Sequence, residues 1–61
     1  MRFMKIKEVK NLTSLSTAEI YRRIAAGTFP KQIHLGPKSV AWIDAEVMAW
    51  AEAQITASRI Q

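Results

Sequence analysis

The spacing of apolar residues divides the chain into helical and extended stretches. Ile6, Val9 and Leu12 recur every three residues, which is the spacing of one face of a helix. They predict a short first helix over about residues 6–11, although no good N-cap residue precedes it.

A capping box marks the start of a second helix. In Ser16-Thr17-Ala18-Glu19 the serine hydroxyl can accept the backbone N–H of the glutamate, whose carboxylate can reach back to the serine N–H. Leu15 and Ile20 occupy the two positions of a hydrophobic staple around this cap. The cap therefore places the start of the helix at Ser16.

The second helix should be short and should follow the first closely. Ile20 and Ile24 lie four residues apart and predict its buried stripe. We expect it to end near Ala26, because Gly27 can adopt the left-handed conformation that closes a helix. Two helices joined by a turn of three or four residues result.

After the second helix the apolar spacing changes to alternation. Ile33 and Leu35, then Val40 and Trp42, are expected to point to one side of a pair of strands. Between them lies Gly36-Pro37-Lys38-Ser39, in which proline suits the second position of a turn. This stretch predicts a small β-hairpin.

A third helix should follow the hairpin directly. Asp44 is expected to cap it, Glu46 lies in the favourable first turn, and Ile43 and Met48 occupy the staple positions. The helix should extend to about Ser58. Its inward-facing residues should be Val47, Trp50 and Ala51.

Length and composition indicate one small domain over residues 1–61, mostly α with a small β-hairpin. A chain of 61 residues has a core only just large enough to be stable alone, which leaves little room for an enzyme cleft. The chain has no cysteine, which excludes disulfides and thiolate zinc sites. It also has no apolar stretch of signal-peptide or bilayer-spanning length. We expect a soluble cytoplasmic protein with no membrane association.

The net charge of +4 favours an anionic partner, and the charge is unevenly distributed. Eight lysines and arginines accompany two acidic residues over residues 1–42, whereas residues 43–61 hold one arginine and three acidic residues. The part before the third helix should therefore meet the partner.

Several motifs occur in a characteristic order along nearly the whole chain. They are Ile6-Lys7-Glu8-Val9, Leu15-Ser16, Ile20-Tyr21-Arg22, Gly27-Thr28-Phe29-Pro30, Leu35-Gly36, Ser39-Val40-Ala41-Trp42 and Glu46-Val47-Met48-Ala49-Trp50. This order resembles the AlpA family of small phage-type transcriptional regulators, within the winged-helix group that includes MerR-like and excisionase-type domains. One departure is Ser14, because such sequences often carry glycine in this turn. If the position needs a left-handed backbone, serine costs about 1 kcal/mol there.

The resemblance implies a winged helix-turn-helix, in the order helix, helix, hairpin, helix, that binds specific sequences of duplex DNA. It implies regulation of phage or mobile-element genes by a nucleoid-associated protein. In such proteins the second helix enters the major groove with its N-terminal residues nearest the base edges. The candidate DNA-binding residues are Ser16, Thr17, Ala18, Tyr21, Arg22, Arg23, Lys31 and Lys38.

A rotation of 100° per residue gives these candidates separate roles. Ala18 and Arg22 fall on the outward face, with Thr17 and Tyr21 on one flank and Glu19 and Arg23 on the other. The arginine at 22 can pair with guanine or a phosphate, the threonine and alanine offer a hydroxyl and a methyl group to base edges, and the tyrosine suits a phosphate.

Each candidate also has a simpler interpretation. The two arginines can form a solvated face, with Glu19 and Arg23 as an ordinary i,i+4 pair. Lys38 can be a polar turn residue or the phosphate contact of a wing tip, and the two interpretations carry equal weight. Lys31 is a weaker candidate. Three basic residues before the second helix are expected to add to the positive electrostatic field of the chain. They are Lys5, Lys7 and Lys10.

The aromatic residues and the single histidine are expected to be structural. Trp42 and Trp50 can be stacking platforms for single-stranded nucleic acid, but their inward positions favour the core, and Phe29 should form a corner with Pro30. His34 should be an outward strand residue, with no cysteine or nearby carboxylate at metal-ligand spacing. We therefore expect no enzyme, cofactor or metal site.

Two alternatives stay open beside the regulator. The first is an excisionase-like architectural factor that recruits an integrase. The second, of a different class, is a protein-interaction module that docks through residues 45–57 of the third helix, where charge serves only solubility. The further partners considered are integrase, RNA polymerase and a second copy of this chain, in a homodimer or a cooperative assembly on DNA.

Overall fold

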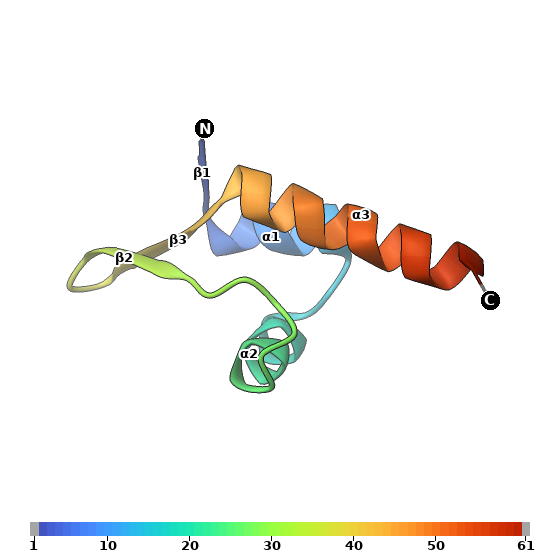
Figure 1. The fold of residues 1–61 in the computed structure, drawn as a ribbon. Helices are drawn as coiled ribbons and strands as arrows, with labels where there is room; N and C mark the ends of the chain where they lie inside the picture. The colour runs from blue at the N-terminus through green and yellow to red at the C-terminus, as the bar shows by residue number, and fades with distance from the viewer. Residues whose placement is uncertain (1, 61) are drawn as a thin grey trace.

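The computed structural model describes residues 2–60, which form three helices and three short strands (Figure 1). In chain order they are β1 (Phe3–Met4), α1 (Ile6–Thr13), α2 (Thr17–Ala25), β2 (Ile33–Gly36), β3 (Ser39–Ile43) and α3 (Asp44–Ile60). The expected order of helix, helix, hairpin and helix is confirmed. The strand β1 is an addition to it. None of the helices within residues 2–60 has both the length and the apolar character that a bilayer span requires.

The strands form one antiparallel sheet in the order β1-β3-β2. Met4 of β1 lies opposite Trp42 of β3, and on the other side of β3 His34 lies opposite Val40. Next to the sheet, the Asp44 carboxylate accepts a hydrogen bond from the backbone N–H of Arg2 at 2.9 Å. The segment before α1 is thereby fixed to the start of α3.

The core is assembled from one buried residue of almost every element, with Trp42 fully buried at its centre. Its members are Met4, Val9, Ile20, Phe29, Trp42 and Val47. The Trp42 indole Nε1–H donates to the Pro30 carbonyl at 3.0 Å, so burial leaves its one polar group satisfied. Trp42 and Phe29 are therefore core residues as expected, and the exposed His34 is an outward strand residue. Trp50 packs against the core while remaining half-buried.

Three apolar residues for which the spacing predicted packing are exposed. The first is Leu12 of α1, at 42%. Leu35 is 49% exposed, because the pairing of β2 with β3 is irregular between His34 and Gly36 and the alternation fails there. Met48, which was predicted to form a staple with Ile43, is 50% exposed. Val47 takes the inward position, and the next residue is turned by about 100° away from it.

Two residues with positive φ shape the chain around α2. Ser14, in the turn before the helix, has φ 61° and ψ 18°, and its N–H donates to the Lys10 carbonyl at 2.8 Å. Gly27, after the helix, has φ 78°. The glycine adopts this conformation without strain, whereas the serine carries the left-handed penalty that the glycine-bearing sequences avoid.

Only the first part of α3 packs on the rest of the molecule. Val47 is buried and Trp50 and Ala51 are half-buried, but every residue from 52 to 60 is exposed. In Figure 1 this end of the helix extends away from the sheet, opposite to the β2–β3 hairpin. The two projections account for the elongated extents of 42 × 24 × 19 Å.

Candidate nucleic-acid interface

α2 is capped and packed on one side and exposed on the other. The Ser16 hydroxyl accepts the backbone N–H of Glu19 at 3.1 Å, which confirms this half of the capping box. Ile20 is fully buried and Ile24 is half-buried, so the predicted stripe anchors the helix to the core. The exposed residues of the helix and its cap are Ser16, Thr17, Ala18, Tyr21, Arg22 and Ala25.

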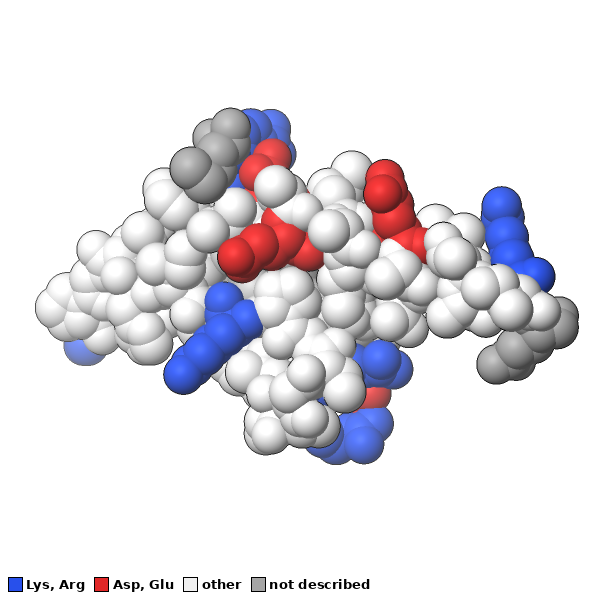
Figure 2. Space-filling model, viewed as in Figure 1, with Lys and Arg blue, Asp and Glu red and all other residues white. Residues whose placement is uncertain are grey.

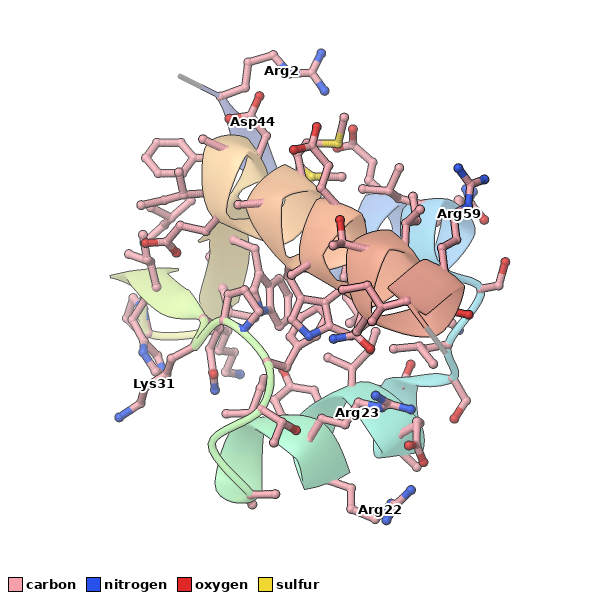
Figure 3. All side chains as sticks on the ribbon, turned by 45° about the vertical axis from the view of Figure 1, so that its right-hand side comes forward. Arg2, Arg22, Arg23, Lys31, Asp44 and Arg59 are labelled. Atoms are coloured by element: carbon pink, nitrogen blue, oxygen red, sulfur yellow. The ribbon has the colours of Figure 1, made fainter. Side chains whose placement is uncertain are left out.

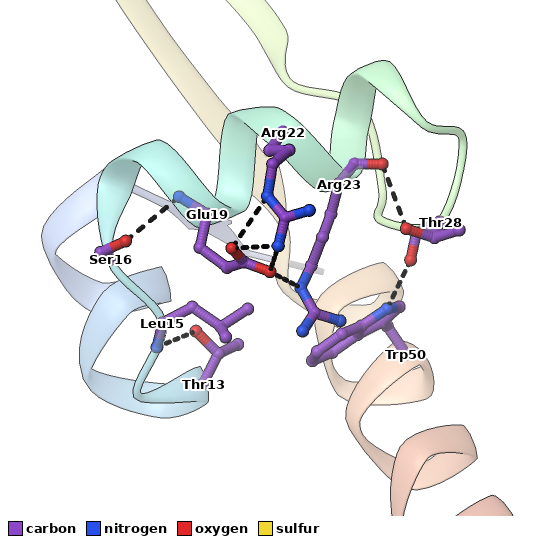
Figure 4. Close-up of polar contacts among 8 residues, drawn as sticks. All are labelled: Thr13, Leu15, Ser16, Glu19, Arg22, Arg23, Thr28 and Trp50. Atoms are coloured by element: carbon purple, nitrogen blue, oxygen red, sulfur yellow. Dashed lines mark hydrogen bonds and ion pairs between the residues drawn. The ribbon is translucent and has the colours of Figure 1, made fainter.

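The Glu19 carboxylate does not reach back to the Ser16 N–H, because two arginines occupy its oxygens (Figure 4). Arg22 donates from Nε to Oε1 at 3.0 Å and from Nη2 to Oε1 at 2.5 Å and to Oε2 at 2.6 Å. These charge-assisted bonds, with the hydrogen bond from Arg22 as the main cause, lower the pKa of Glu19 and raise the pKa of Arg22. Arg22 nevertheless keeps 74% of its side chain exposed.

The two arginines of α2 point in different directions (Figure 3). Arg22 points away from the body of the molecule, whereas Arg23 points towards α3. Arg23 donates from Nε to the second oxygen of Glu19 at 2.9 Å, and its guanidinium lies 5.9 Å from the ring centroid of Trp50. That indole is fixed in turn, because its Nε1–H donates to the Thr28 carbonyl at 2.7 Å. The structure therefore places Arg23 in the seam between α2 and α3.

Tyr21 lies beside the core on the exposed side of α2. Its ring meets Trp42 edge to face, with 6.1 Å between the centroids, and 38% of the residue is exposed. This contact packs one edge of the ring on Trp42 of β3 and leaves the residue partly accessible to a ligand.

Other basic residues lie outside α2, at Lys31, Lys38 and Lys5. Lys31, in the segment between α2 and β2, points outward in Figure 3, and Lys38 is exposed in the turn between β2 and β3. Lys5 has a role that the sequence did not reveal. Its Nζ donates to the Ser39 hydroxyl at 2.8 Å and to the Val40 carbonyl at 3.3 Å, which fastens the start of β3 to the segment before α1.

Charge is unevenly distributed over the face that Figure 2 shows. In Figure 2 acidic side chains gather over α3, while basic side chains lie along the lower edge, with others near the two ends of the chain. The acidic residues of α3 are Asp44, Glu46 and Glu52. The side that carries α2 and the hairpin is therefore the one suited to a polyanion.

Two helices joined by a tight turn, followed by a hairpin and a third helix, define the chain as a winged helix-turn-helix protein, with the β2–β3 hairpin as the wing. A family model described as prophage CP4-57 regulatory protein (AlpA) matches residues 2–55, so the chain belongs to the AlpA family of phage-type regulators. The chain is also similar to a protein of Enterobacteria phage P4 described as uncharacterized protein ORF88. The two are 46% identical over 54 residues, which cover 88% of this chain and 61% of the phage protein. This chain thus spans about three fifths of that relative's length.

Proposed function

We propose that this chain is a single DNA-binding domain that recognises specific duplex sequences and regulates the transcription of phage or mobile-element genes. The observation that supports this function is the exposed polar face of α2, which the opposite, buried face holds firmly on the core. A helix presented in this way fits the major groove, with its N-terminal residues nearest the base edges. Membership of the AlpA family supports a regulatory role rather than catalysis.

In this proposal α2 and the wing contact different parts of the DNA. Thr17 and Ala18 present a hydroxyl and a methyl group to base edges, and Arg22 presents its guanidinium. Tyr21 and Ser16 contact phosphates beside the groove. Lys38 at the wing tip and Lys31 between α2 and β2 contact the backbone, and Arg23 supports the helix from the seam with α3. The protein then acts in the cytoplasm on the nucleoid, without cofactor or metal.

Selection of bound fragments from a randomised duplex library, repeated at several salt concentrations, tests this function. Lys38→Ala should weaken binding to every duplex by a similar factor and reduce the slope of log affinity against log salt by about 1 unit, because a phosphate contact releases a counterion. Thr17→Val keeps the methyl group and removes the hydroxyl, so it should change the preferred sequence and leave the slope nearly unchanged.

Three outcomes would contradict the proposal. Absence of duplex binding at low salt would reject a DNA-binding role. If Lys38→Ala shifts the sequence preference, a wing that contacts only phosphates is excluded. If Thr17→Val and Ala18→Ser both leave the sequence preference unchanged, α2 does not contact the bases.

The exposed end of α3 favours a second candidate function, in which the domain recruits another protein. Ile55 is 50% and Ile60 78% exposed, in the part of α3 where every residue from 52 to 60 is exposed. An excisionase-like factor bound to DNA through α2 can present this surface to an integrase or to RNA polymerase, or to a second copy in a dimer or cooperative assembly. Bending of target DNA in circular-permutation assays, together with loss of integrase recruitment in Ile55→Ser, would favour this function over promoter control.

A further inference from the structure

Glu19 lies at the centre of the only cluster of ion pairs that α2 forms within residues 2–60. Its carboxylate is 25% exposed, and both of its oxygens accept hydrogen bonds from the adjacent arginines. An acidic group on a face that meets DNA opposes binding, because it repels phosphates. Its position on this face therefore needs an account beyond helix stability.

The carboxylate is itself held in place. Arg23 binds its Oε2 from the α3 side, and the ring of Trp50 lies 5.9 Å from that guanidinium. Trp50 in turn packs against Phe29, with 4.7 Å between the ring centroids, and donates to the Thr28 carbonyl. The position of Glu19 is thus supported from the core outward, through Phe29, Trp50 and Arg23.

Glu19 in turn restricts the orientation of Arg22, whose side chain is exposed. It engages the Nε and Nη2 groups of Arg22, which leaves the two N–H donors of Nη1 without a hydrogen-bond acceptor among residues 2–60 (Figure 4). A guanidinium held on one edge has lost much of its rotational freedom before any ligand arrives, so less entropy is lost on binding. The side chain of Arg22 as a whole points away from the body of the molecule.

We propose that Glu19 is a positioning residue that determines the sequence specificity of α2, because it holds Arg22 with its free edge directed at the acceptors of a guanine. This inference rests on the proposed DNA-binding function. Guanine presents two acceptors, O6 and N7, in the major groove, and an arginine held in one orientation distinguishes this pattern from the other base pairs. Without the carboxylate the same arginine can turn to any phosphate, which contributes affinity but no selectivity.

The proposal and a simple electrostatic role for Glu19 predict different results for Glu19→Gln and Glu19→Ala. Both variants keep the Ser16 cap, because the cap uses the backbone N–H of residue 19. Loss of the negative charge should strengthen binding to random duplex and steepen the salt slope by about 0.9 in either case. If Glu19 positions Arg22, the ratio of specific to random affinity should also fall, by about tenfold or more. If Glu19 is only a charge, both affinities rise together and the ratio is unchanged.

Glu52→Gln is the matched control, because it makes the same change of charge on the exposed part of α3. It should leave the ratio of specific to random affinity unchanged. In an Arg22→Ala background, Glu19→Gln should no longer change that ratio. A ratio that falls equally in both backgrounds would overturn the positioning role, as would a ratio that Glu19→Gln leaves unchanged in the parent.

Side-chain NMR of the free protein supplies a test that needs no DNA. The order parameter of the Arg22 Nε–H group should fall in Glu19→Gln and Glu19→Ala, whereas Glu52→Gln should not change it. An unchanged order parameter would overturn the positioning role whatever the protein binds. If the unsubstituted protein binds no duplex at low salt, the proposed function is overturned as well. If it binds selectively and Glu19→Gln leaves its ratio of specific to random affinity unchanged, only the inference is overturned.

Discussion

α2 and α3 pack on the same core but differ in length, in charge and in how much of each helix is buried. α2 has nine residues with Arg22 and Arg23 in its last turn, whereas α3 has seventeen with Asp44 and Glu46 in its first turn. Ile20 and Val47 are their fully buried anchors. Packing therefore explains where each helix lies, while the charge of the remaining surface decides what it can bind. Of these two helices, α2 is the one that combines a fully buried anchor with an exposed arginine.

The largest effect is expected where the two helices share a support. Trp42→Ala should cost about 3–5 kcal/mol, because it removes the central buried side chain of the core, and such a loss approaches the whole stability of a small domain. Urea denaturation followed by circular dichroism measures it. A stably folded variant that had lost only nucleic-acid binding would show that Trp42 is a binding platform and not the common support of α2 and α3.

The next effect separates the helices by function. Arg22→Ala should weaken specific DNA binding by about 1–3 kcal/mol and leave the fold intact, because the side chain is 74% exposed. Arg59→Ala removes the same charge from the last turn of α3 and should change specific binding far less. Titrations of both variants at physiological salt make the comparison. Equal losses would mean that net charge, and not the face of α2, governs binding.

A smaller effect concerns how each helix is connected. α3 follows β3 without a loop, but α2 follows a turn in which Ser14 has a left-handed backbone. Ser14→Gly should raise the free energy of unfolding by up to about 1 kcal/mol, since glycine removes the strain but loses more backbone entropy on folding. Ser14→Ala retains the Cβ and should give no such gain. A gain as large with alanine as with glycine would locate the effect in the hydroxyl group.

The smallest expected effect is on the response of stability to acid. A hydrogen bond from Arg22 lowers the pKa of Glu19, and the backbone N–H of Arg2 lowers the pKa of Asp44 at the start of α3. A carboxyl group whose pKa is lower in the folded state stabilises the fold above its unfolded pKa, and this contribution is lost as pH falls. Melting temperatures should therefore decrease from about pH 5 downwards, and less steeply in Glu19→Gln and in Asp44→Asn. Parallel curves for the parent and both variants would exclude these two groups.

The features of the fold that sequence predicted are those encoded by local signals. Ser16 and Gly27 mark the two ends of α2, and each acts through its own backbone or the next few residues. The strand β1 has no such signal, because it consists of two residues whose partners lie about 40 positions further on. Leu35 was placed wrongly for a related reason, since the irregular pairing that turns it outward depends on the opposite strand.

The candidate site was predictable in its residue types but not in its contacts. The spacing along α2 placed Arg22 outward and Arg23 on a flank, and the positions agree with Figure 3. It predicted the i,i+4 pair of Glu19 with Arg23, but it could not show that the Arg23 guanidinium lies 5.9 Å from the ring of Trp50, because that contact joins α2 to α3. Lys5 was predicted only to add to the positive electrostatic field. Its contact with Ser39 could not be predicted, because the two residues lie 34 positions apart in the sequence.

The pairing of β1 with β3 also affects the order in which the elements form during synthesis of the chain. Phe3 and Met4 emerge from the ribosome early, but their hydrogen-bonding partners Ile43 and Trp42 are made much later. Closing a loop of about 40 residues costs roughly 3 kcal/mol of chain entropy, so the segment before α1 stays unpaired until that partner strand is available. The helix-turn-helix of α1 and α2 can thus form its local hydrogen bonds first, but the strand that completes the sheet joins last, when the start of α3 has already been translated.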